Sequence, residues 1–424
     1  MRFAKLERRP ELDALRGLFL LVMITAHLPT HLSHFVDDPF GYISSAEGFV
    51  GLSAVLLGRI YYGEFFRDAV RARTRIWRRT LRLYGYHMAT IGLAFTVAAS
   101  YAAAMHRPAI LNLLHFYFLH PVVAITGSLL LLYCPPLLDV LPLFIVFMLA
   151  TPLVLSAARR VGWGWVLAAS GGIWAGAQLG LRSLVYGWLL TLIHLRIPLR
   201  QTGSFNLLAW QAVWVLGLWL GARSAEGKLP LDRVPRWGFV TAAILCAFFV
   251  AVRHGWLGPH LDADSFGIEL DKWRMAPVRA VNVAAFVVVS WRLRRYFVHL
   301  LTHEPLLTMG KVSLQVFCAH LFFVFAGLSL LVGDRRHLHG TTALVLIAIT
   351  YPALTVIAYA VQRSRQRESA AVAALREQSN AEGSSNTSAE AAMVPARSGG
   401  EEDAGMVSEP SFRRLEVRSA QDRS

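Results

Sequence analysis

The chain alternates between long apolar stretches and shorter polar connections. A helix needs about 20 mainly apolar residues to cross a lipid core of about 30 Å. Ten stretches approach that length, near residues 12–30, 46–63, 83–105, 137–157, 162–180, 206–222, 237–253, 277–292, 310–332 and 342–362. The pattern predicts an all-α fold, a polytopic membrane helical bundle with about ten transmembrane helices.

A further apolar stretch, around residues 119–134, could form an eleventh span. Loop charge discriminates between the two topologies, because cytoplasmic loops carry an excess of Lys and Arg. With ten spans and a cytoplasmic N-terminus, inside segments hold 25 Lys and Arg residues and outside segments hold 9, whereas eleven spans give 20 against 14. We therefore expect ten spans and two cytoplasmic termini, with residues 112–134 as an interfacial or re-entrant segment at the outer face.

The two ends of the chain need separate interpretation. The basic N-terminus resembles a signal peptide, but the apolar segment behind it contains Asp13 and His27 and lacks a small-residue cleavage site, so it reads as a retained first span. From residue 363 onward, Ala, Ser, Glu, Arg and Gly replace the large apolar residues. Residues 1–362 are therefore expected to form the transmembrane domain, and residues 363–424 a disordered cytoplasmic tail.

Composition excludes several classes of protein. Hydrophobic residues make up 55% of the 424 residues and charged residues only 16%, compared with about 25% charged in soluble domains. A soluble α/β enzyme and a secreted disulfide scaffold are both disfavoured. Cys134, Cys246 and Cys318 follow no metal-binding spacing, and we expect no metal site and no bound cofactor.

The formal net charge of +15 suggests nucleic-acid binding until the charges are located. Most of them lie in the predicted inside segments, so the lipid bilayer is the expected partner and nucleic acid is not. Eight Arg residues fall within 59–82 alone, including Arg75, Arg78 and Arg79. Two interpretations remain open: a topology determinant against anionic headgroups, or a cytoplasmic landing surface for a phosphorylated donor such as a nucleotide or coenzyme A, because guanidinium groups match phosphate oxygens.

Ionisable residues inside predicted spans are functional candidates, because lipid does not tolerate them. Arg16 and His27 lie in the first span and are eleven residues apart, close to three helical turns. They share one face and are separated by about 16 Å along the axis. His27 lies near the outer end and Arg16 near the inner end, although a structural core pair would show the same spacing.

The second predicted span begins near Glu47, at the depth where the first span ends. A carboxylate beside His27 would orient the imidazole and stabilise its protonated form, as a general base requires. Glu47 could equally be an acid favoured by the helix N-terminus. Five further polar or aromatic residues fall at the same outer level, where they could bind a hydroxyl-rich acceptor: Asp139, Asn206, Trp210, Gln211 and Asp271. His320 is deeper, and we interpret it first as a hydrogen-bonding residue of the bundle interior.

Several of these segments resemble a known family. Residues 12–18 followed by His27 resemble the Arg and His signature of the membrane acyltransferase-3 superfamily, and the chain is most similar there to OpgC-type proteins. Further blocks of likeness occur at 46–53, 135–144, 205–211, 277–282 and 310–314. The second-span block departs from the family pattern, because Ala54 follows Ser53 where the family commonly has glycine.

The resemblance implies a multi-pass protein of the bacterial inner membrane and an O-acyltransferase activity. The acyl group, of the succinyl type in this family, would pass from cytoplasmic acyl-CoA, with succinyl-CoA as the co-substrate, to hydroxyls of an osmoregulated periplasmic glucan. The family's Arg and His map onto Arg16 and His27. Combined with the positions of the charged residues, this gives the hypothesis that His27 and Glu47 are catalytic and that Arg16 and the arginines of 59–82 receive the donor. The alternatives are a solute or glycan transporter, disfavoured because no half-to-half repeat is evident, and a membrane scaffold without chemistry.

Overall fold

The computed structural model describes residues 9–258, 270–333 and 336–392. Within these ranges the chain is all-helical, with no β-strand beyond two isolated bridges. A helix coincides with each of the ten predicted apolar stretches: α1 (Pro10–His27), α3 (Ser45–Arg67), α4 (Ala69–Leu93), α9 (Val140–Arg160), α10 (Trp163–Gln178), α12 (Leu207–Ala225), α13 (Arg236–Arg253), α15 (Pro277–Leu301), α17 (Ser313–Ser329) and α18 (Gly340–Ala392). The predicted fold class is therefore confirmed at the level of helices.

Shorter helices connect these elements. After α4 the chain continues through a π-helical turn, η1 (Ala94–Ala98), into α5 (Ala99–Ala104). The remaining short helices are α2 (Leu32–Val36), α6 (Pro108–Leu113), α7 (His115–Leu119), α8 (Pro121–Leu129), α11 (Leu181–Ile193) and α16 (Glu304–Lys311), with 3-10 turns at Leu199–Gln201 and Pro230–Arg233. The candidate eleventh span thus contains only short helices, the longest of 9 residues, or about 14 Å.

By length and composition, 5 helical segments of the described chain could cross a membrane: Ser45–Arg67, Ala69–Ala104, Val140–Arg160, Arg236–Arg253 and Gly340–Leu375. The bent pair α16 and α17, with 96° between its two helices, would add a sixth. Helices α1 and α15 each carry too many charged residues to qualify on composition, and α10 is short. The chain is an all-helical membrane protein, and ten crossings remain a prediction.

The C-terminal region differs from its expected disorder. Helix α18 runs without interruption from Gly340 to Ala392, about 30 residues beyond the predicted end of the last span. Ala, Glu, Gln and Arg dominate that extension, and these residues favour helix even where no apolar face is available for packing. Residues 9–365 belong to one compact unit and the chain from Gln366 to a second. Residues 393–424 of the predicted tail lie outside the described residues.

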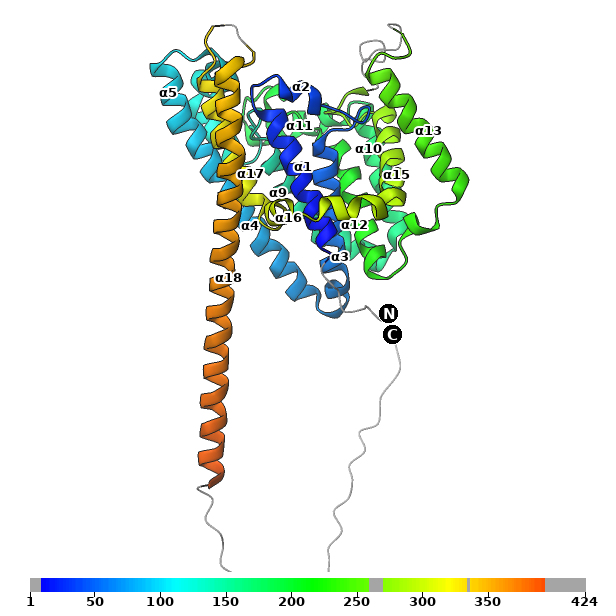
Figure 1. The fold of residues 1–424 in the computed structure, drawn as a ribbon, viewed down its shortest axis with the longest axis vertical. Coiled ribbons are helices and arrows are strands. Elements are labelled where there is room, and N and C mark those ends of the chain that lie inside the picture. Colours follow the sequence, from blue (N-terminus) through cyan, green and yellow to red (C-terminus); the bar gives the residue numbers. More distant parts are fainter. Residues whose placement is uncertain (1–8, 259–269, 334–335, 393–424) are drawn as a thin grey trace, which may run out of the picture. The chain divides into compact units, whose positions relative to one another are not determined.

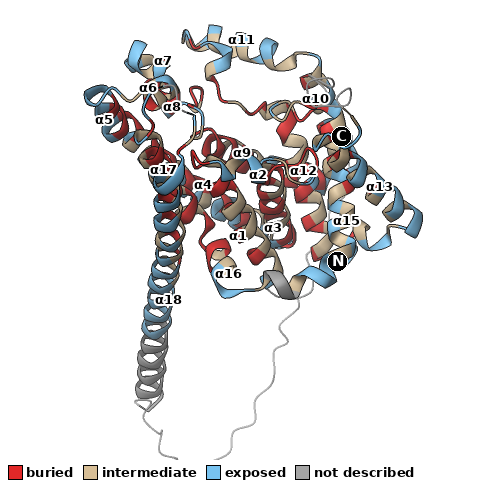
Figure 2. Ribbon diagram, turned by 45° about the horizontal axis from the view of Figure 1, so that its top comes forward, coloured by how far each residue is buried: buried red, intermediate tan, exposed pale blue. Residues whose placement is uncertain are grey.

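The core of the first unit is built around the long helices α1, α3 and α12. Helices α1 and α3 pack against each other, and α3 also packs along α12, while α4 lies against α9 and α13 against α15 (Figure 1). Buried residues concentrate on α3, α9 and α12, whereas α11 has none and α13 has few (Figure 2). The outward helices therefore expose apolar side chains, as expected for surfaces in contact with lipid.

Glycine allows the central helices to approach backbone to backbone. A Cβ atom on Gly221 of α12 would lie 2.1 Å from the carbonyl oxygen of Val55, and one on Gly58 of α3 would lie 2.2 Å from that of Leu218. Small residues at such crossings let membrane helices pack closely. In the same way, a Cβ on Gly310 would lie 1.8 Å from the carbonyl oxygen of Asp13, so α16 is pressed against α1 one turn from Arg16. These contacts fix the helix that carries Arg16 and His27.

Candidate active site

The last residue of α1 pairs with a histidine of α17. His27 Nδ1 lies 3.0 Å from His320 Nε2, and the two rings stack with centroids 5.3 Å apart. His320 is fully buried and His27 is half-buried. Helix α1 positions His27 near its C-terminal end, while the sharp bend between α16 and α17 directs α17 back along the bundle.

The hydrogen bonds of this pair define the tautomers of two neutral imidazoles. The Phe317 carbonyl oxygen can only accept, so His320 Nδ1 donates to it. His320 Nε2 must then accept, and His27 Nδ1 donates to it. The second nitrogen of His27, Nε2, is left with its lone pair, and it has no hydrogen-bond partner among the described residues. The chain Phe317, His320, His27 therefore ends in a free basic nitrogen.

Glu47 does not pair with His27, the partner that the sequence suggested. As the third residue of α3 it completes a capping box: its Oε2 accepts from the backbone N–H and hydroxyl of Ser44. Its Oε1 accepts from Arg279 Nε at 2.6 Å, which makes a buried ion pair. Among the described residues, no hydrogen bond or ion pair joins Glu47 to His27. The structure thus gives His27 the neighbour His320 where the sequence suggested Glu47.

Arg279 connects three parts of the fold. It lies near the start of α15 and is 2% exposed. Besides Glu47 it binds Asp38 through both terminal nitrogens, at 3.0 and 3.3 Å. Asp38 lies in the connection between α2 and α3, so this network joins α3, α15 and that connection at the end of the bundle where α1 ends. The sequence identified Arg279 only as part of a family-like block and gave it no role.

A small cavity of about 50 Å³ lies within the bundle, and neither His27 nor His320 lines it. Arg16 and Arg79 line it, together with Ser53 and mostly apolar residues. Phe317 also lines it, and the Phe317 ring contacts His320 with centroids 4.8 Å apart. Arg16 Nε and Ser53 Oγ are buried and have no hydrogen-bond partner among the described residues. The cavity therefore combines two guanidinium groups, one of them with an unsatisfied nitrogen, an unsatisfied hydroxyl and an apolar wall.

The other predicted donor residues lie outside this cavity. Arg75 is exposed and bonds both carboxylate oxygens of Glu64, at 2.9 and 2.8 Å. Arg78 is also exposed. Of the four arginines proposed to receive the donor, the structure brings Arg16 and Arg79 together and leaves Arg75 and Arg78 on the surface.

The predicted outer-mouth residues bind mainly the backbone of neighbouring loops. Asn206 caps α12 by accepting from the Leu208 N–H, and Trp210 Nε1 donates to the Lys272 carbonyl oxygen. Asp271 accepts from the Trp273 N–H at 2.8 Å. The structure thus brings these residues together around the segment before α15. Gln211 instead pairs with Ser170 of α10 through two hydrogen bonds of 2.8 Å.

Asp139 is the buried acid of this region. It precedes the first residue of α9, and its Oδ2 accepts from the Ser204 N–H at 2.9 Å. Its side chain is buried, so this hydrogen bond replaces contact with water. Asp139 therefore joins the start of α9 to the loop before α12.

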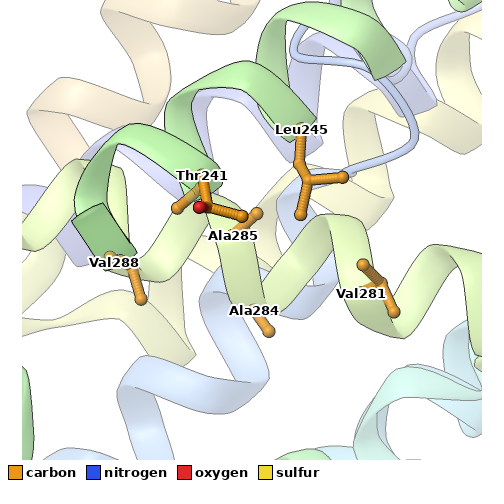
Figure 3. Close-up of a pocket in the computed structure, with 8 residues that line it drawn as sticks. Thr241, Leu245, Val281, Ala284, Ala285 and Val288 are labelled. Atoms are coloured by element: carbon orange, nitrogen blue, oxygen red, sulfur yellow. The ribbon is translucent and has the colours of Figure 1, made fainter. Parts of the chain in front are cut away.

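A second hollow has no such chemistry. It is a groove of about 270 Å³ between α13 and α15, lined by Thr241, Leu245, Val281 and other small or aliphatic residues (Figure 3). Thr241 is the single hydroxyl-bearing residue of its lining, which contains no ionisable side chain. The histidine pair, with the arginine-lined cavity that Phe317 connects to it, is therefore the better candidate for catalysis.

The family of the chain agrees with this choice. A family model described as OpgC protein matches residues 8–366, which include His27, His320 and the whole cavity. The chain belongs to the OpgC protein family. No curated protein and no solved structure matched the chain.

Membership in the OpgC family implies a membrane-bound transferase of the acyltransferase type with a role in glucan modification. Sequence reasoning found Arg16 and His27 of this OpgC-family protein but assigned His320 only an interior hydrogen bond. The sequence did show that His320 is a second histidine within an apolar stretch. It can reach His27 only if α17 packs against α1, and the structure shows that packing.

Proposed function

We propose that this protein transfers an acyl group, of the succinyl type, from acyl-CoA to hydroxyl groups of a periplasmic glucan, with His27 as the general base. The supporting observation is the hydrogen-bond chain from the Phe317 carbonyl through His320 to His27. It leaves His27 Nε2 free to accept a proton. Family membership supplies the reaction class, and the substrates are part of the proposal.

In the proposed reaction, His27 Nε2 removes the proton of a glucan hydroxyl while the hydroxyl oxygen attacks the thioester carbonyl carbon. The tetrahedral intermediate then collapses, the C–S bond breaks, and the departing sulfur takes the proton from His27. The products are an ester and a free thiol. While His27 carries the proton, His320 Nε2 accepts from His27 Nδ1 and stabilises the imidazolium.

Arg16 and Arg79 are proposed to guide the donor from the cytoplasmic face of the inner membrane, with both termini on that side. Their guanidinium groups suit the phosphates of coenzyme A, and the cavity leads from them toward Phe317 and His320. At about 50 Å³ it has room for only a few water molecules. An acyl-pantetheine arm must therefore displace side chains such as Met148 or Leu314, which line the cavity.

The proposal is tested with purified protein in detergent, succinyl-CoA and an unsubstituted glucan. We expect release of free thiol that depends on the glucan, and mass spectrometry of the glucan should show the mass of one succinyl group for each substituent. A different added mass would correct the acyl group and keep the enzyme. Glucan binding without thiol release would contradict the enzyme and favour a transporter.

His320 should act as a positioning residue in this reaction. We expect His320→Ala to lower kcat about 10- to 100-fold, part of the 10²- to 10⁴-fold that a general base supplies, with KM for the glucan unchanged. His320→Gln should recover most of that loss, because the amide oxygen can still accept from His27 Nδ1. Cys318→Ala, on the same helix, is the matched control. Equal kcat for the Ala variant and the native protein would contradict this role.

A further inference from the structure

A cluster of four histidines lies just beyond the end of α1. His31 and His34 belong to the connection after α1 and to the short helix α2, while His337 and His339 precede α18. An isolated parallel bridge between Thr30 and Leu338 joins the two segments. The Leu338 N–H donates to the Pro29 carbonyl oxygen at 2.7 Å. Residues about 300 positions apart in sequence are thus held side by side.

The side chains of this cluster face one another. Ring nitrogens of His31, His34 and His337 all lie within 4.8 Å of one another. The ring of His337 is 5.2 Å from that of His31 and 4.7 Å from that of His34, centroid to centroid. His31 Nε2 also lies 2.9 Å from His339 Nδ1. Such convergence of imidazoles has no evident role in packing, because His31 and His34 are exposed.

We propose that His31, His34 and His337 bind one transition-metal ion, with Zn²⁺ as the expected cation. Zinc binds imidazole nitrogen at about 2.0–2.1 Å, which puts tetrahedral ligand atoms roughly 3.3 Å apart. Small rotations of exposed side chains suffice to reach that spacing from the present one. A set of imidazoles without carboxylates selects Zn²⁺, Ni²⁺ or Cu²⁺ over Mg²⁺ and Ca²⁺.

His339 supports the same site. Its hydrogen bond with His31 fixes the orientation of that ring, a role often filled by a partner of a metal-bound histidine. The bound ion would connect the segment after α1 to the start of α18. Its ligand His31 lies only four residues beyond His27. The ion would therefore restrain the end of the helix that carries the proposed base, without taking part in acyl transfer.

Zinc binding can be measured without any acyl donor, so its result is independent of the proposed function. Full-length protein, purified in detergent with an affinity tag free of histidine, is titrated calorimetrically with ZnCl₂. We expect saturation at one Zn²⁺ per chain and a higher unfolding temperature with Zn²⁺ present. His34→Ala and His337→Ala should each weaken binding at least about tenfold.

The matched control is His115→Ala, which removes an exposed histidine from α7 and should leave zinc binding unchanged. Co²⁺ provides a second measurement, because its absorption bands report nitrogen coordination directly. Absence of saturable binding would overturn the proposal. So would unchanged affinity in both His34→Ala and His337→Ala, or an equal loss in His115→Ala, since these results would indicate only scattered surface binding.

Discussion

Replacing His27 by alanine should abolish measurable acyl transfer while the protein still accumulates in the membrane. General-base catalysis contributes about 10²- to 10⁴-fold to rate, and His27 Nε2 is the nitrogen that the hydrogen-bond chain through His320 leaves free. The substitution leaves the buried Nε2 of His320 without its donor, which should cost about 1–3 kcal/mol of stability. Thiol release from acyl-CoA and the mass of the glucan product provide the two measurements.

Two comparisons make this result specific. His27→Gln keeps a hydrogen-bonding group beside His320 but cannot act as a base near neutral pH, so it should be as inactive as His27→Ala. His254→Ala removes an exposed histidine that stacks on Trp256 and should retain full activity. Native rates of glucan substitution in His27→Ala would remove His27 from the mechanism and with it the proposed reaction.

The positions of the long helices were predictable from the sequence, because apolar runs of span length coincide with helices across the described chain. The number of crossings was less predictable. Helix α1 contains Glu11, Asp13 and Arg16 within 18 residues, so composition alone does not qualify it as a span. Arg16, one of these charges, also lines the cavity. A residue of the proposed site thus lowers the hydropathy of the helix that carries it.

The position where α18 ends could not be predicted from the apolar residues that form the core. The scarcity of large apolar side chains after residue 363 predicts that this region contributes little to a hydrophobic core. It does not exclude a helix, since backbone hydrogen bonds and the propensity of Ala, Glu and Arg favour one as far as Ala392. Packing and local structure are separate properties, and composition reports chiefly the first.

The sequence does not reveal which residues of the site are paired by tertiary packing. His27 and Arg16 share one helix, so their spacing could be read directly. His320 and the histidines at 337 and 339 come from the other end of the chain, and only packing of α17 on α1 and the bridge at Thr30 bring them close. The spacings His31-x-x-His34 and His337-x-His339 are visible in the sequence, but nothing local brings the two pairs together into the proposed metal site.

Replacing Arg279 by methionine should destabilise the protein by about 3–5 kcal/mol, the cost of leaving a buried carboxylate without its cation. Glu47 is 3% exposed, and without Arg279 only the Ser44 donors would remain to it. Glu47→Gln should cost less, because the amide oxygen still accepts from Arg279 and Arg279 keeps Asp38. Thermal unfolding in detergent, compared between variants, measures both changes.

The double variant Glu47→Gln with Arg279→Met separates a structural role of Glu47 from a catalytic one. Removing both charges leaves no unpaired buried carboxylate at Glu47, so the double variant should be more stable than the sum of the single losses implies, by about 0.5–3 kcal/mol. If Glu47 serves packing alone, activity per folded molecule stays native in Glu47→Gln. A large loss of kcat in Glu47→Gln, with native stability, would instead indicate that Glu47 acts on the reaction. A purely structural residue would lower turnover only by loosening the fold.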